Sequence, residues 1–304
     1  QLAHQLYAEH SFSYKNLKYG AFLMLWGYLK KMVIADRAVS LINTVTADYR
    51  QYSGTVILIT VLVYALQLYA DFSGGIDISR GFAEILGIQM AENFKRPYFA
   101  VNINDYWRRW HITLGAWMKN YVFYSLAMSK RFMKIGKYLK QNYGSNPLGA
   151  HVAKVLPTGI ASFITFLSVG IWHGANMKYV AFGIWNGGVI MVSILMQPLF
   201  DKAVAKLKIR TKSLWWKAFQ ILRTFVIVLI GYMFDIGANF TSAMHMLGRC
   251  VTDFSLNKCK VMEQITSCGL TLEDYKLLLI MTVLIFIVSL IQERHPDTTM
   301  RALL

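Results

Sequence analysis

Charged residues are scarce in this chain of 304 residues. Asp, Glu, Lys and Arg together make up 16% of it, whereas hydrophobic residues make up 55%. Because soluble domains carry roughly 25% charged residues, this composition excludes an ordinary soluble fold and indicates a polytopic membrane protein. We expect an all-α fold with several membrane-spanning helices.

Cysteine is also rare, and common catalytic motifs are missing. Cys250, Cys259 and Cys268 show no CxxC or Cys/His spacing, so the sequence argues against a zinc site, and their odd number argues against a closed disulfide framework. We place all three in one polar loop and predict no metal. The sequence has no P-loop, GxSxG, HExxH or dinucleotide-binding motif, so it gives no support to the enzyme classes that those motifs mark.

Acidic residues are outnumbered two to one, with 16 Asp and Glu against 32 Lys and Arg and a net charge of +16. In a soluble protein this excess would point to nucleic acid. Here the basic residues lie between apolar segments, as the positive-inside rule predicts for cytoplasmic loops. We therefore predict membrane lipids, and not nucleic acid, as the partner of this charge. Residues 119–154 and 201–217 are predicted to be cytoplasmic, and residues 235–275 to be outside.

The chain also lacks the charged start and the cleavage site of a signal peptide. It begins with Gln1 and ends with Leu303 and Leu304. We expect a fragment that lacks N-terminal helices and a C-terminal tail.

Six apolar segments are long enough to be considered as membrane spans. They are residues 18–34, 54–70, 155–171, 179–197, 217–234 and 276–292. Lys30 and Lys31 interrupt the first of them, and with Asp36 and Arg37 they are most simply a helix end at the membrane interface. We treat residues 1–304 as a single membrane-embedded domain.

The segment 71–118 mixes glycines, charges and aromatic residues. It is too polar for a simple spanning helix and too apolar for a solvated loop. Irregular backbone at membrane depth requires protein or a water-filled cavity around it. We predict that this segment forms re-entrant or interfacial helices around a central cavity.

Side-chain spacing gives two further expectations for this segment. Trp107, Trp110, His111 and Leu114 follow the three-and-four spacing of one helix face. Asp105 and Arg109 are four residues apart and are predicted to pair.

His173 is the first candidate for chemistry. It lies in SVGIWHGANM, between Trp172 and Gly174, within a long apolar passage. Ionisable residues inside membranes are rare and are functional hypotheses by default. A neutral imidazole in a cavity is suited to act as a general base toward a hydroxyl group. The alternative is a structural histidine that is hydrogen-bonded across a helix turn.

Other polar residues have two interpretations each. His111, with Arg108, Arg109 and Trp110, belongs either to a site or to an interfacial anchor. Asn186 either serves the site or joins helices through hydrogen bonds. Asp71 and Asp77 are either cavity-lining acids or N-caps.

Five segments, in this order, carry a resemblance to a known family. They are KKMVIAD (30–36), LYADFSGGIDISRG (68–81), ENFKRPY (92–98), DYWRRWHITLGAWMKNYVF (105–123) and GIWHGANMKYVAFGIWNG (170–187). Together they closely resemble the membrane-bound O-acyltransferase family, over about residues 18–250. The nearest branch is similar to the bacterial alginate O-acetyltransferases and to the D-alanyl-lipoteichoic acid transferases.

This resemblance implies acyl transfer to a hydroxyl group by a multi-pass protein of the bacterial cell membrane. In the family, the histidine of the WHG motif is catalytic, and it corresponds to His173. The histidine of the RWH motif corresponds to His111. Many relatives have a further histidine where this chain has Asn186, and often arginine where it has Asp235, to which we assign no role. Residues expected to bind substrate or donor are Trp172, Asn186, Arg108, Arg109, Trp110 and Asp71.

The implied donor is a cytoplasmic thioester, either acetyl-CoA or an acyl-phosphopantetheine carrier protein, and no tightly bound cofactor is expected. The implied acceptor is an extracytoplasmic cell-envelope polysaccharide, with D-alanyl transfer to teichoic acid as the alternative. A covalent acyl intermediate is left open, and an extracytoplasmic acyltransferase- or esterase-like partner is a further expectation. Lys95, Arg96, Arg108, Arg109 and Lys119 form a basic rim that attracts either donor phosphates or lipid headgroups.

A different class of function stays open on the residues alone. A polysaccharide or lipid transporter component would use His173 for gating or proton relay. Transporters often contain paired repeats with matching broken helices. No such repeat occurs in this sequence, which favours the enzyme.

Overall fold

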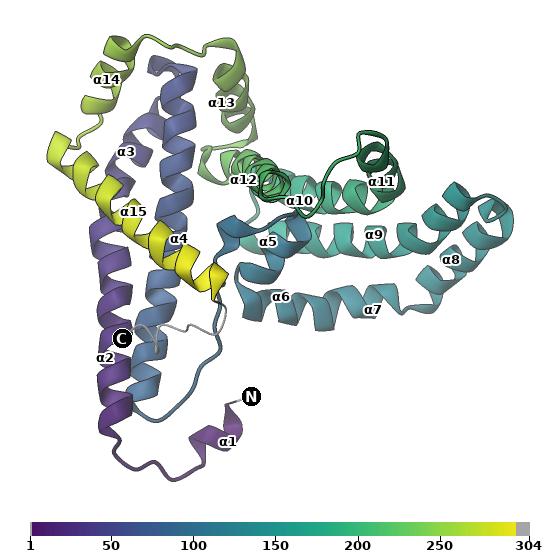
Figure 1. Ribbon diagram of the computed structural model, residues 1–304, viewed down its shortest axis with the longest axis horizontal. Helices are drawn as coiled ribbons and strands as arrows, with labels where there is room; N and C mark the ends of the chain where they lie inside the picture. Colours follow the sequence, from purple (N-terminus) through teal and green to yellow (C-terminus); the bar gives the residue numbers. More distant parts are fainter. Residues whose placement is uncertain (1, 296–304) are drawn as a thin grey trace. The chain divides into compact units, whose positions relative to one another are not determined.

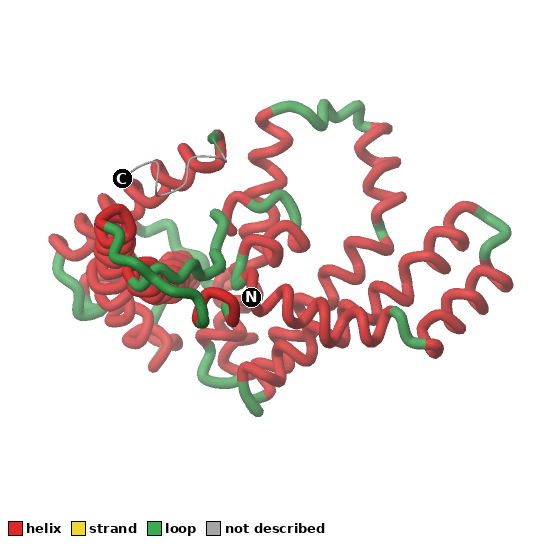
Figure 2. Tube along the Cα trace, turned by 90° about the horizontal axis from the view of Figure 1, so that it is seen from below, coloured by secondary structure: helices red, strands yellow, loops and turns green. Residues whose placement is uncertain are grey.

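Helices form the regular structure of residues 2–295, which are the residues that this computed structural model describes (Figure 1). Figure 2 shows these helices joined by loops, and no strand occurs within the described range. Five of the helices are long and apolar enough to cross a membrane: α4 (Gly54–Ile85), α9 (Pro147–His173), α10 (Met177–Leu195), α12 (Leu214–Ile236) and α15 (Leu272–Arg294). The prediction of an all-α, polytopic membrane protein is therefore confirmed.

Five of the six predicted spans coincide with these helices, apart from residues 196 and 197, which lie beyond the end of α10. The sixth, residues 18–34, is helical but divided: α2 (Tyr14–Tyr28) runs into the π-helical segment η1 (Leu29–Ala35), and α3 (Asp36–Ala47) follows. The prediction of a helix end at Lys30 and Lys31 is therefore wrong, because helix continues through both residues.

The chain divides into two compact units, and the first contains the described parts of residues 1–96 and 244–304. In this unit α2 packs along α4, as Figure 1 shows. The two helices approach closely at two glycines, since a Cβ atom on Gly27 would lie 2.6 Å from the carbonyl oxygen of Gly74. This close approach places the polar residues of η1 directly beside those of α4. The remaining helices of the unit are α1 (Ala3–Leu6), α3, the short 3-10 helix η2 (Tyr49–Gln51), residues 244–252 of α13 (Phe240–Thr252), α14 (Lys258–Thr266) and α15.

The second unit contains residues 97–243. Its centre is the antiparallel hairpin of α9 and α10, which pack along each other. Before the hairpin come the 3-10 turn η3 (Pro97–Phe99), α5 (Ile103–Arg109), α6 (Ile112–Met118), the π-helical segment η4 (Lys119–Phe123), α7 (Tyr124–Ala127) and α8 (Lys130–Tyr143). After it come α11 (Gln197–Lys206), α12 and the start of α13 (Phe240–Thr252). The prediction of one membrane-embedded domain over residues 1–304 stays a prediction.

Capping side chains fix where the long helices begin. The side chains of Asn146, Asn176 and Ser213 each accept a backbone N–H in the first turn of α9, α10 and α12. Thr271 and Asp274 form a reciprocal capping box at the start of α15. These interactions satisfy N–H groups that have no partner within the helix, so each apolar helix has a defined start.

The segment 71–118 differs in part from the expectation. Residues 71–85 complete α4, so the prediction of irregular backbone is wrong for them. Their charges are tolerated in a long helix because neighbouring side chains neutralise them: Lys31 Nζ lies 2.6 Å from Asp71 Oδ1, and Lys30 Nζ lies 2.7 Å from Asp77 Oδ2. Irregular backbone and short helices follow, from residue 86 to residue 118.

The segments between the predicted spans are also more helical than expected. Residues 119–154 contain η4, α7 and α8, and α11 overlaps the second basic segment. The cysteines do not share one loop, because Cys250 is in α13, Cys259 is in α14 and Cys268 follows α14. These short helices are polar and lack the continuous apolar run by which a membrane span is identified. Composition alone therefore does not predict that these segments are helical.

Candidate active site

A cavity of about 550 Å³ lies in the unit formed by residues 97–243. Two kinds of element form its walls: the short helices α5 and α6 with η4, and the long helix α9. Its lining includes Trp107, Arg108, Trp110, His111, Leu114, Lys119, Ser162, Thr165 and Phe166. The lining is mostly apolar with a few polar groups, which is typical of ligand sites.

His111 occupies the break between α5 and α6. The backbone of Trp110 is extended, and His111 takes the left-handed conformation, with φ 44° and ψ 57°. A residue other than glycine rarely adopts this conformation, and such strain clusters at functional sites. The break turns the chain so that the imidazole becomes part of the cavity wall.

The predicted common helix face of Trp107, Trp110, His111 and Leu114 is wrong, because one continuous helix does not exist there. The four side chains nevertheless line the same cavity. The left-handed backbone at His111 changes the direction of the chain and brings the four residues together. A rule based on helical spacing cannot predict this change of direction.

Asn186 holds one wall of this cavity in place. Its side chain is buried, and its Oδ1 atom accepts a hydrogen bond from Trp107 Nε1 at 3.3 Å. Its Nδ2 atom donates to the Phe182 carbonyl at 2.9 Å. Asn186 therefore joins α10 to α5, which is the helix-joining interpretation of this residue. Its expected role in binding substrate stays a prediction.

Trp110 forms a second wall and is held by tyrosines. Its ring stacks on Tyr106 with centroids 5.8 Å apart, and the Tyr106 hydroxyl lies 2.7 Å from the Tyr232 hydroxyl on α12. The Tyr232 hydroxyl also lies 3.2 Å from the Tyr98 hydroxyl. Buried hydroxyls that bond to one another satisfy their polar atoms, so this cluster fixes Trp110 rigidly.

The two arginines of the RRWH sequence differ. Arg109 Nε lies 3.1 Å from Asp105 Oδ1, so the predicted pair within the helix is confirmed. Arg108 has a side chain that is 71% exposed, with its guanidinium 3.6 Å from the same carboxylate. Arg108 lines the cavity and its side chain is largely exposed, whereas Arg109 is not among the lining residues and pairs with Asp105.

His173 is the last residue of α9, at the turn of the α9–α10 hairpin. Its side chain is exposed, as is Trp172 beside it. The imidazole stacks on Tyr179 with centroids 6.0 Å apart and meets the edge of Phe182 at 5.7 Å. Phe182 also contacts Trp107, which lines the cavity. His173 is therefore linked to the cavity wall through one aromatic ring.

The two histidines interact electrostatically. Burial lowers the pKa of His111, and a charge on the nearby His173 lowers it further. Both effects favour a neutral imidazole at His111 near pH 7. The structure thus places both histidines that the sequence singled out in the unit that holds the cavity, and of the two His111 lines it.

Asp71 belongs to the other unit. It lies in the interior of α4 and pairs with Lys31, so the N-cap interpretation of Asp71 is wrong. The same holds for Asp77, which lines a second, polar cavity of about 300 Å³. The expected role of Asp71 in binding substrate stays a prediction.

Sequence reasoning missed the buried contacts of Lys30. Its Nζ atom donates to Ser73 Oγ at 2.8 Å as well as to Asp77, and the side chain is only 4% exposed. A usable signal existed: Ser73, Asp77 and Arg80 follow the helical spacing of one face of α4. Within residues 2–295, no group of three or more His, Cys, Asp or Glu side chains is arranged to hold a metal ion.

Comparison with known proteins adds independent information. The model of the membrane-bound O-acyltransferase family matches residues 6–139, a range that contains His111. A probable alginate O-acetylase of Pseudomonas syringae pv. tomato is 31% identical over 229 residues, which cover 75% of this chain and 38% of the relative. A peptidoglycan O-acetyltransferase of Helicobacter pylori is 30% identical over 236 residues, covering 77% and 39%.

A teichoic acid D-alanyltransferase of Bacillus subtilis is 27% identical over 230 residues, which cover 75% of this chain and 53% of the relative. The chain spans about two fifths of the length of the two O-acetylating relatives and about half of this one. The matched family model, these relatives and the helical membrane fold agree with one another. The chain belongs to the membrane-bound O-acyltransferase family.

Proposed function

We propose that this protein moves an acyl group, acetyl in the first instance, from a cytoplasmic thioester donor to hydroxyl groups of an extracytoplasmic cell-envelope polysaccharide. The observation that carries the proposal is a mostly apolar cavity that His111 lines in a strained conformation, with His173 linked to its wall through Phe182. The names of the relatives support the acyl chemistry, since they include O-acetylating enzymes.

The reaction needs a base for the acceptor hydroxyl. In our proposal His173 takes the hydroxyl proton, and the oxygen attacks the thioester carbonyl. The carbon–sulfur bond then breaks, and the imidazolium returns the proton to the leaving thiolate. The rings of Trp172, Tyr179 and Phe182 around His173 support this role, because aromatic walls fix the orientation of an imidazole.

His111 is proposed to stabilise the oxyanion that forms on the thioester carbonyl. A neutral imidazole carries one N–H donor, and the lowered pKa of His111 keeps that donor neutral at pH 7. The largely apolar lining around it strengthens such a hydrogen bond, because little water competes. Trp107, positioned by Asn186, and Trp110 would form flat walls for the acyl group.

The donor and the location follow from the same reasoning. Arg108 and Lys119 line the cavity, and we propose that they attract a negatively charged donor, either acetyl-CoA or an acyl-phosphopantetheine carrier protein. The proposed location is the bacterial cell membrane. An extracytoplasmic acyltransferase- or esterase-like partner would complete transfer to the polysaccharide.

Acyl transfer by the purified membrane protein tests this proposal. We expect His173→Ala to lower the rate of transfer from acetyl-CoA to an acceptor glycan by roughly 10²–10⁴-fold. His151→Gln is the matched control, because His151 belongs to the same unit and bonds to the Ile194 carbonyl on α10. Full activity in a folded His173→Ala protein would rule out the assignment, and activity lost equally in both variants would indicate a structural effect.

Transfer of D-alanine to teichoic acid is the second candidate, favoured by the similarity to the Bacillus subtilis D-alanyltransferase. The same residues would serve, because a D-alanyl thioester presents the same carbonyl. Parallel assays with acetyl-CoA and with a D-alanyl carrier protein decide between the two. Turnover of the carrier alone would select D-alanylation.

A further inference from the structure

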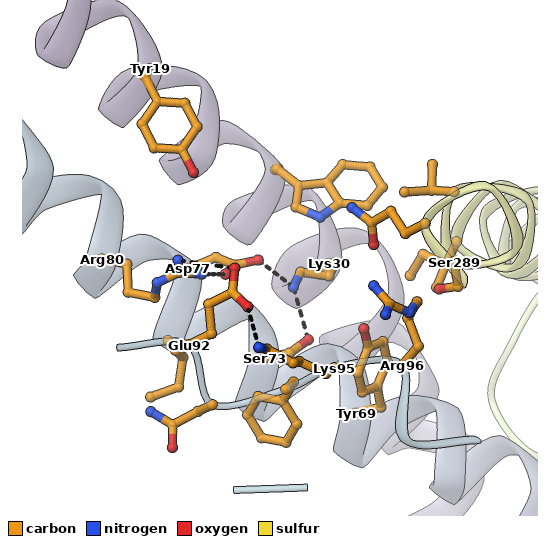
Figure 3. Close-up of a pocket in the computed structure, with 17 residues that line it drawn as sticks. Tyr19, Lys30, Tyr69, Ser73, Asp77, Arg80, Glu92, Lys95, Arg96 and Ser289 are labelled. Carbon is orange, nitrogen blue, oxygen red and sulfur yellow. Dashed lines mark hydrogen bonds and ion pairs between the residues drawn. The ribbon is translucent and has the colours of Figure 1, made fainter. Parts of the chain in front are cut away.

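The polar cavity of about 300 Å³ in the first unit has no role in the proposed reaction (Figure 3). It lies among α2, η1, α4, residues 92–96 and α15, and its volume falls at the lower end of ligand pockets, roughly 300–1,000 Å³. Trp26, Ile76, Ile285 and Val288 give it an apolar side. Six charged side chains are among the other lining residues, which is unusual for a cavity between apolar helices.

The charge of Lys30 is already paired within the protein. The Lys30 ammonium donates to Ser73 and Asp77 at 2.8 and 2.7 Å, as Figure 3 shows. Without Lys30, Asp77 would keep, in the described part of the chain, only its longer contact with Arg80, so the Lys30–Asp77 pair supports the cavity wall. Because its ammonium is already bound to Ser73 and Asp77, Lys30 is not the residue that we expect to bind a ligand in this cavity.

Arg80 is not satisfied in the same way. Its Nε atom is buried and has no hydrogen-bond acceptor among the residues that the structure describes. Its two terminal nitrogens each lie 3.5 Å from an acid, Asp77 and Glu92, which is long for a charge-assisted hydrogen bond. The guanidinium thus keeps donor capacity toward the cavity.

Lys95 stands next to it with similar capacity. Its ammonium is 3.7 Å from Glu92, and its side chain is 56% exposed. Figure 3 shows Lys95 and Arg80 on either side of Glu92. One carboxylate therefore holds two cations loosely, and a ligand with more negative charge and more acceptor atoms would hold both better.

The charge balance favours an anion. Lys30, Arg80, Lys95 and Arg96 line the cavity, against the acids Asp77 and Glu92. Arg96 is neutralised by Glu293 at 3.0 Å. With all three acids counted, the group carries four positive and three negative charges, so one positive charge is left over.

We propose that this cavity binds one phosphate group, which takes the place of Glu92 between Arg80 and Lys95. A phosphate monoester or inorganic phosphate offers at least three acceptor oxygens, in a geometry that matches a guanidinium fork. Two sources present the same chemistry: the phosphomonoester headgroup of a phospholipid, whose chains would follow the apolar side, or a soluble phosphate. This site does not depend on the proposed acyltransferase activity.

Two variants of opposite effect test the proposal in nanodiscs. We expect Lys95→Gln to weaken phosphate binding about tenfold. Glu92→Gln should strengthen it, because the competing carboxylate is removed. Lys276→Gln is the matched control: Lys276 is in the same unit, is 57% exposed, and pairs with a glutamate three residues earlier, as Lys95 does.

Two measurements separate the sources. In phosphatidylcholine nanodiscs, inorganic phosphate is titrated by calorimetry. In nanodiscs that contain phosphatidic acid, a phosphomonoester lipid, native mass spectrometry counts the retained anionic lipid. Binding in the first identifies a soluble phosphate, and retention only in the second identifies the lipid. Binding in neither, or equal changes in Lys95→Gln and Lys276→Gln, would overturn the proposal.

Discussion

His111 shows how two neighbouring groups set the protonation of one residue. Burial and the charge of His173 both lower its pKa, and burial is the larger cause. In a His173→Phe variant we therefore expect the pKa of His111 to rise toward its ordinary value of about 6.5 and to stay below it. Histidine NMR titration measures this shift. The His151→Gln protein serves as the reference, and an unchanged His111 pKa in His173→Phe would show that the two rings do not interact.

The three cysteines should differ in reactivity, because the thiolate is the reacting form. Burial raises the pKa of Cys250 to about 11 and also raises that of Cys268, whereas Cys259 is exposed. At pH 8 we expect a maleimide to modify Cys259 faster than the other two by about tenfold or more. Mass spectrometry after timed quenching measures the order, and early modification of Cys250 would contradict its partial burial.

At the scale of elements, the α9–α10 hairpin depends on close approach of two backbones. A Cβ atom on Gly183 would lie 2.7 Å from the Phe166 carbonyl oxygen and 3.0 Å from Leu167 Cα. Gly183→Ala should therefore separate the helices and destabilise the protein by about 1–3 kcal/mol. Gly188→Ala in the same helix meets nothing within 4 Å and should be neutral or stabilising by up to about 1 kcal/mol. Thermal unfolding in detergent compares them, and equal melting temperatures would refute this packing.

The same elements show what the sequence could predict. The span predicted at residues 155–171 lies within α9, because an apolar run identifies itself locally. Residues 71–85 were misjudged, because Lys30 and Lys31, which neutralise Asp77 and Asp71, are 47 and 40 positions away in the chain. His111 and His173 were found by motif, but the left-handed turn that brings His111 into the cavity has no local signature.

At the scale of the whole molecule, charge should decide which side of the membrane each segment faces. From Tyr106 to Phe200 the chain contains no acid, and five of its basic residues lie on α8. The positive-inside rule therefore predicts that α8 is cytoplasmic and that the α9–α10 turn beside His173 faces the other side. Helix α9, with 27 residues, is long enough to connect the two at about 1.5 Å per residue.

Single cysteines at Lys137 and Ala175, both exposed, test this orientation in a variant without the native cysteines. In intact cells, a membrane-impermeant maleimide should label Ala175→Cys and leave Lys137→Cys unmodified until the cells are permeabilised. Both sites belong to one compact unit, so the comparison reports the direction of α9 alone. Labelling of both from the same side would mean that α9 does not cross the membrane. If both were labelled only after permeabilisation, His173 would lie on the donor side, where no extracytoplasmic hydroxyl could reach it.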